Sequence, residues 1–162
     1  MIVAPFIKHA KDALLGAMIL GAVFFAGEYL YERFSPNHWW VEYKGTSSTG
    51  RLIEGEIDMM SFSAYPRGGR VTWTDRLFCD LPPGEGFRLF SSFVDTASVK
   101  PDLDFSETPW LYKGATPREG STCYMDSNIL IKTPLGLSHE DNSISNTFII
   151  GGQDATNTTT NQ

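Results

Sequence analysis

The sequence contains two cysteines, Cys79 and Cys123, whose thiols can pair with each other or act as nucleophiles. A disulfide between them would close a loop of about 45 residues, which stabilises a domain by roughly 3 to 4 kcal/mol in the chain-entropy model. Disulfides form in oxidising compartments, so this pairing requires that the chain be exported. Sequence does not show that the two Cα atoms come within bonding distance, so two unpaired buried thiols are the alternative.

Nucleophilic chemistry at Cys123 is a second use of these thiols. An apolar segment followed by a β region with the pair Thr122-Cys123 resembles the sortase-like transpeptidases, in which a Cys works with a His and an Arg. A thiol nucleophile of this kind needs a neighbouring base. His38 lies beside the apolar segment and His139 follows the cysteine in a polar loop, so no Cys-His pair is indicated. We assign no catalytic residue and favour a non-enzymatic protein, with a Cys-dependent transpeptidase or hydrolase as the alternative.

Acidic side chains gather in the segment PDLDFSE, where Asp102, Asp104 and Glu107 could supply oxygen ligands to calcium. An EF-hand loop places ligands at alternate positions and a glycine at the sixth, and this segment departs from that pattern. A solvated acidic loop is therefore favoured over a calcium site, and we expect no other metal and no cofactor.

Trp110 and Tyr112 follow Pro109 in a stretch without clear strand periodicity. Aromatic rings on an exposed loop often anchor protein interfaces, because they bury a large area at a small entropic cost. The sequence therefore offers these two rings as a possible interface, with packing of the loop onto the domain as the alternative.

The elements that must position these residues fall into two parts of different composition. Residues 1–34 hold 23 of the 67 hydrophobic residues and no Ser or Thr, and residues 13–27 form an unbroken apolar run. At about 1.5 Å per residue, positions 13 to 31 span roughly 28 Å, close to the hydrocarbon thickness of a bilayer. We expect an uncleaved membrane-anchor helix over 1–34. A buried core helix and a cleaved secretory signal are the alternatives.

Charges beside the apolar run predict its orientation. Lys8 and Lys11 precede it, whereas Glu28, Glu32 and Arg33 lie at its other end. The positive-inside rule then places the N-terminus in the cytoplasm and the C-terminal part in the periplasm or outside the cell. The expected location is the cell membrane, crossed once.

Small residues recur along one face of this helix, at Ala13, Ala17 and Gly21. Such stripes let two membrane helices approach closely. Besides the lipid membrane, the expected partner is therefore another protein, or a second copy of this chain, bound through the helix.

After Ser35-Pro36, which ends the helix, short runs of β-branched and aromatic residues alternate with polar ones and are separated by turn residues. This pattern predicts a mainly β fold, an antiparallel β-sandwich of about seven strands over 35–153. The stretch 95–119 is expected to be a long loop with one short extended piece around 110–112, and 154–162 a flexible tail. The predicted strands are 39–44, 52–62, 70–79, 87–94, 122–125, 129–133 and 147–150.

The charge of the second part excludes one class of partner. Residues 35–162 carry 10 Lys and Arg against 16 Asp and Glu, a balance that repels phosphates, so nucleic-acid binding is not expected. Asp75, Arg76 and Asp80, around the third predicted strand, are expected to form surface ion pairs of small energetic effect.

The rhythm of WWVEYK, EGEIDMM and RVTWTDRLFCD within residues 39–80 resembles small uncharacterised bacteriophage and prophage proteins, in which one apolar helix precedes a compact β domain. The resemblance implies a viral origin and carries over no site residues. Together these features predict a membrane-anchored, non-enzymatic β-sandwich with a binding or structural role. A virion or envelope assembly component is a further alternative.

Overall fold

A computed structural model describes residues 3–101 and 103–152, without the side chains of residues 3–10 and 103–106. The chain divides into two units, Met1–Ser35 and Pro36–Gln162, and each is described by itself. The expected tail, 154–162, lies outside the described residues.

The first unit is one helix, α1 (Val3–Phe34). Its Ala, Leu and Met residues favour helix, and it ends where Pro36 would break the hydrogen-bond ladder. The stretch Lys11–Phe34 is long and apolar enough to cross a membrane, and its most apolar 18-residue window contains no buried residue. Apolar side chains point outward all round the helix, including Leu20 (72% exposed) and Phe24 (63%). Such a helix is unfavourable in water and suits a lipid environment.

The predicted small-residue stripe lies uncovered on α1. Ala13 and Ala17 are exposed, and no heavy atom would come within 4 Å of a Cβ added at Gly21. Helix association through this stripe stays a prediction.

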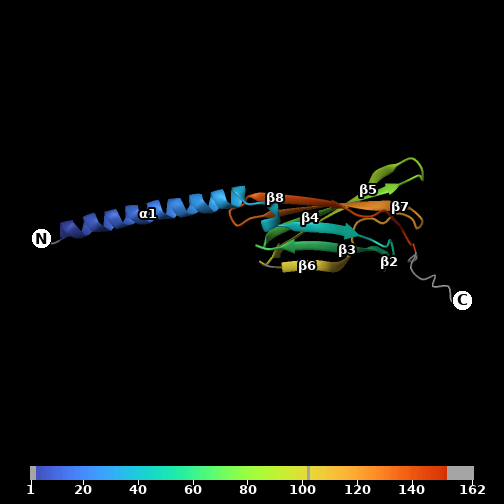
Figure 1. Cartoon of the computed structure of the whole chain (residues 1–162), viewed down its shortest axis with the longest axis horizontal. Coiled ribbons are helices and arrows are strands. Elements are labelled where there is room, and N and C mark those ends of the chain that lie inside the picture. Colours follow the sequence, from blue (N-terminus) through green and yellow to red (C-terminus); the bar gives the residue numbers. More distant parts are fainter. Residues whose placement is uncertain (1–2, 102, 153–162) are drawn as a thin grey trace. The chain divides into compact units, whose positions relative to one another are not determined.

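The second unit is mainly β and contains two antiparallel sheets stacked as a sandwich, as predicted (Figure 1). A short 3₁₀ turn, η1 (Asn37–Trp39), precedes the strands. In the first sheet, β3 (Glu56–Tyr65) lies between β6 (Leu103–Tyr112) on one side and β1 (Glu42–Ser47) and β2 (Leu52–Ile53) on the other. The second sheet has the order β5 (Phe87–Val99), β4 (Gly69–Asp80), β7 (Thr122–Lys132) and β8 (Ser138–Ile144), and β9 (Phe148–Ile149) also pairs with β7.

The two long sides of the sandwich differ. On one side β1 and β8 are joined, because the Tyr43 amide donates to Asp141 Oδ2 at 3.1 Å and the Ser48 amide donates to Asn146 Oδ1 at 3.0 Å. On the other side β5 pairs only with β4 and β6 only with β3, among the described residues. The hydroxyls of Ser91 and Tyr112, 2.9 Å apart, connect these two edges at one point. The sandwich is therefore more open between β5 and β6.

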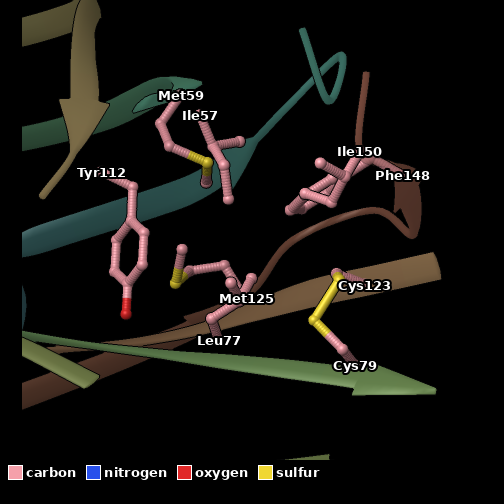
Figure 2. Close-up of a cluster of buried hydrophobic side chains, with 9 residues drawn as sticks. All are labelled: Ile57, Met59, Leu77, Cys79, Tyr112, Cys123, Met125, Phe148 and Ile150. Carbon is pink, nitrogen blue, oxygen red and sulfur yellow. A yellow bond between two sulfur atoms is a disulfide. The ribbon is translucent and has the colours of Figure 1, made fainter. Parts of the chain in front are cut away.

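Apolar side chains fill the space between the sheets in two separate clusters. One contains Ile57, Met59, Leu77, Met125, Tyr112 and the two cysteines, together with Phe148 and Ile150 (Figure 2). The other contains Trp40, Val41, Tyr65, Val71, Val99, Ile129 and Ile131. The predicted inward positions Ile57, Met59 and Val71 are all buried.

Two expectations about the strands are wrong. Residues 95–119 are not one long loop, because β5 continues to Val99 and β6 begins at Leu103. The inward row of β5 includes Ser91 and Asp95, and β6 contains Pro109 and a bulge at Glu107, so neither strand shows clean alternation. Proline and bulges are tolerated here because β6 is an edge strand.

The sequence also missed β8, and the two runs predicted over 122–133 form the single strand β7.

Cys79 and Cys123 form a disulfide, the first of the two arrangements that the sequence allowed. They occupy opposite positions on the paired strands β4 and β7, with Cα atoms 4.1 Å apart. Figure 2 shows the bond at one end of the first cluster, with Leu77 and Met125 between it and Tyr112. The bond therefore links two strands of one sheet across a sequence separation of 44 residues.

We expect the double variant Cys79→Ala/Cys123→Ala to lose roughly 3 to 4 kcal/mol of unfolding free energy, because the unfolded chain regains the freedom that the disulfide removes. Chemical denaturation of the full chain in an uncharged detergent measures this loss. Adding a reductant should destabilise the wild-type protein to a similar degree and leave the double variant unchanged. A wild-type protein insensitive to reductant would contradict the prediction.

Candidate functional site

A layer of polar side chains separates the two apolar clusters in the middle of the sandwich. On β4 the inward row reads Val71, Trp73, Asp75, Leu77 and Cys79, so a carboxylate takes a position where the pattern calls for an apolar residue. Ser127 lies directly opposite Asp75 on β7, between apolar positions on either side. Ser61 and Ser63 hold the equivalent central positions on β3. The inward-facing rows of β4, β7 and β3 are thus each interrupted by polar residues in the middle of the sandwich.

Asp75 is the central residue of this layer and is only 6% exposed. Its Oδ1 accepts a hydrogen bond of 2.6 Å from the Ser127 hydroxyl. No described residue donates a hydrogen bond to its Oδ2, and no described basic nitrogen lies within 4 Å of the carboxylate. Burying a carboxylate without a cationic partner is costly, so this arrangement is unusual for a purely structural core.

The polar layer opens into a pocket of about 250 Å³ between the two sheets. Its walls are aromatic and its remaining lining groups are hydroxyls and two carboxylates. They are Tyr43 from β1, Ser61, Ser63 and Tyr65 from β3, Trp73 and Asp75 from β4, Phe93 and Asp95 from β5, and Thr108 and Trp110 from β6. Apolar walls with a few convergent polar groups are the usual composition of a ligand site.

Asp95 brings a second carboxylate to this pocket. It lies opposite Trp73 in the β4–β5 ladder, while Phe93 lies opposite Asp75, so Asp95 and Asp75 are diagonal neighbours on the inward face. Asp95 is exposed, and its Oδ1 accepts a hydrogen bond of 2.7 Å from the Thr96 amide. One carboxylate is therefore buried within the pocket and the other is open to solvent.

The electrostatics of the pocket favour neutral forms of its buried acids. Burial raises the pKa of Asp75 to about 6, the hydrogen bond from Ser127 partly offsets this rise, and the negative charge of Asp95 adds to it. Burial also raises the pKa of Tyr43 to about 12, with opposing contributions from nearby hydroxyls, the first of them Ser127. A positive charge in the pocket would relieve the cost of ionising Asp75.

Two of the aromatic walls are held in place by their own contacts. The Trp73 indole Nε1 donates to the Tyr65 hydroxyl at 2.8 Å, and the two rings meet edge to face with centroids 6.2 Å apart. Tyr65 is fully buried in the second cluster. The wall formed by Trp73 and Tyr65 is therefore already in position without a ligand.

The two aromatic residues singled out from the sequence lie in different environments. Trp110 lines the pocket and Tyr112 is fully buried in the first cluster, so Tyr112 is not an exposed interface anchor. Both point inward because they lie opposite the buried Met59 and Ile57 in the β3–β6 ladder. An interface role for Trp110 stays a prediction.

The calcium prediction falls largely outside the described part of the chain, since Asp102 and the side chain of Asp104 are not described. Glu107 is exposed and has a φ of 98° at the bulge of β6. Within residues 3–101 and 103–152 no cluster of His, Cys, Asp and Glu could hold a metal ion.

The expected surface pairing of Asp75, Arg76 and Asp80 is wrong. Arg76 pairs instead with Asp126 at 3.5 Å, and Asp80 accepts hydrogen bonds from the Gly84 and Gly86 amides. Asp75 faces inward because it shares the alternation of Val71, Leu77 and Cys79. That alternation was the sequence signal that could have revealed a buried carboxylate.

A second hollow, of about 660 Å³, involves the first sheet and the segment before β2. Along β3 it is lined by Asp58, Met59, Met60 and Phe62. Its charged groups, Arg51 and Asp58, are not buried, so it lacks the desolvated charge that distinguishes the pocket between the sheets.

Comparison of the chain with models of known protein families, with curated proteins and with solved structures finds no match.

We expect Asp75→Asn to stabilise the protein at pH 8 and to have little effect at pH 4. The folded-state pKa of about 6 lies above the ordinary value of 3.8, so the folded chain holds this proton more tightly. The cost of ionisation is absent below about pH 4 and complete above pH 6 to 7, where it amounts to roughly 3 kcal/mol. The isosteric amide removes that cost.

Urea unfolding of the full chain in detergent at both pH values measures the effect. Asp126→Asn is the control, because it makes the same charge change on an outward position of β7; since it also removes the ion pair with Arg76, it should bring no gain in stability at pH 8. A difference between Asp75→Asn and wild type that does not change with pH would contradict the assignment.

Proposed function

We propose that this protein is a single-pass membrane protein that carries a non-enzymatic β-sandwich binding module on the extracytoplasmic side. The proposal is based on the combination of an exposed apolar helix with a disulfide-bonded β domain that contains a pocket between its sheets. The helix has the length and composition of a membrane anchor, and the pocket has the composition of a ligand site.

The disulfide supports the proposed side of the membrane. Cytosolic proteins rarely keep such bonds, whereas exported domains use them for stability. Lys8 and Lys11 before the apolar run favour a cytoplasmic N-terminus, which places residues after Phe34 in the oxidising compartment. The two arguments use different residues and agree.

Binding is favoured over catalysis by the residues that line the pocket. Within the described chain its lining contains no His, Cys or Lys, so its acid–base groups are limited to two carboxylates and to hydroxyls. Cys123, the nucleophile of the alternative transpeptidase, is bonded to Cys79 and fully buried. A thiolate attack would require both reduction of the bond and opening of the core.

A fusion of alkaline phosphatase after Gln162 tests the topology, because this enzyme becomes active only where its own disulfides can form. We expect an active fusion in bacterial cells. A fusion whose Lys8 and Lys11 are both replaced by Glu is the matched comparison, and it should lose activity because the charge bias of the flank is reversed. Activity of a cytoplasmic β-galactosidase fused at Gln162 of the unaltered chain would overturn the proposal.

A further inference from the structure

We propose that the pocket between the sheets binds an organic ammonium ion, with Asp75 and Asp95 as its counter-charges and the surrounding aromatic rings as its walls. This inference deepens the proposed function and rests on it. It identifies the chemical class of the ligand that the binding module takes.

The first argument is charge. The pocket presents two carboxylates, and among the described residues no Lys, Arg or His lines it. Asp75 is 6% exposed, and its only hydrogen-bond donor in the described chain is the neutral hydroxyl of Ser127. A cation that enters the pocket meets a carboxylate that is largely removed from solvent, so the attraction is stronger than it would be at the protein surface.

The second argument is the nature of the walls. Rings from five strands line the pocket: Tyr43, Tyr65, Trp73, Phe93 and Trp110. The faces of aromatic rings attract cations, and Trp does so most strongly. A metal ion would prefer a shell of oxygen ligands on all sides, whereas most of the lining surface of this pocket is apolar. The combination of aromatic rings with a carboxylate suits an organic cation, whose charge is spread over apolar groups.

The third argument is size. A volume of about 250 Å³ is slightly below the roughly 300 to 1,000 Å³ of drug-sized sites. The pocket therefore admits one compact group, such as a methylated ammonium head. The hydroxyls of Ser61, Ser63 and Thr108 add acceptors for a cation that also carries N–H groups.

The test is a titration of the full chain in uncharged detergent at pH 8 with choline chloride and with butylammonium chloride, against sodium chloride of equal ionic strength. Trp73 and Trp110 lie in the pocket, so tryptophan fluorescence reports occupancy. We expect a saturable change with at least one ammonium salt. The neutral isostere of choline, 3,3-dimethylbutan-1-ol, should produce none at the same concentrations.

Variants separate the pocket from the rest of the surface. Asp75→Asn should weaken binding by about tenfold or more, since one buried charge pair is lost. Asp95→Asn should weaken it several-fold, because its carboxylate is more exposed. Asp126→Asn, the matched change on the outward face, should bind within twofold of wild type. Near-ultraviolet circular dichroism confirms that each variant is folded.

The ammonium group can come from a dissolved compound or from a lipid headgroup, and vesicles distinguish the two sources. We compare choline titrations of the protein in phosphatidylglycerol vesicles and in vesicles that also contain phosphatidylcholine. Weaker apparent choline binding in the second case assigns the site to the headgroup, and equal binding assigns it to a dissolved compound. Both outcomes support an ammonium site.

Three results would overturn the inference: no saturable response to either ammonium salt, equal binding of the neutral isostere, or an equal loss of binding in Asp126→Asn and Asp75→Asn. A failure here with an active phosphatase fusion rejects the ligand class alone. An inactive phosphatase fusion with an active cytoplasmic β-galactosidase fusion rejects the proposed function, whatever choline does.

Discussion

The ladder between β4 and β7 is the interaction on which the rest of the domain depends. These two strands pair residue by residue from Arg70 with Lys132 to Cys79 with Cys123. Their inward rows supply side chains to both apolar clusters, and their outer edges pair with β5 and β8. The same register aligns Asp75 with Ser127 and the two cysteines with each other. The positions of the core residues, the disulfide and the pocket residues therefore all depend on this one strand register, because a slip of one residue would turn every inward side chain outward.

Within that frame, the domain keeps a carboxylate where an apolar residue would be more stable. Two separate apolar clusters and a disulfide supply stability around the interruption. Polar groups retained in a core at a cost to stability are common at functional sites. Asp75 lies between the clusters and lines the pocket between the sheets, so its energetic cost fits the binding role proposed above.

The asymmetry of the sandwich decides where that site is accessible. Side chains of Asp141 and Asn146 hold β1 against β8, whereas β5 and β6 remain edge strands. Edge strands can carry polar inward residues, prolines and bulges, because fewer neighbours constrain them. The pocket is lined from this more open side by Asp95, Phe93 and Trp110. The irregular features that hide the end of β5 and β6 from sequence analysis therefore lie in the strands that line the pocket.

The sequence by itself determined the two-part organisation, the mainly β class and most strand positions, because the apolar run and the period-two alternation are local signals that burial imposes. It also identified the cysteine pair as a candidate, without its geometry. Only the tertiary structure decided that Tyr112 is buried, that residues 95–99 and 103–112 are strands, and that Asp75 is an interior carboxylate instead of a surface ion-pair partner. Those features depend on which strands face one another across the sandwich. A single chain's local pattern does not encode that pairing, because each face of a strand acquires its environment only when the second sheet packs on it.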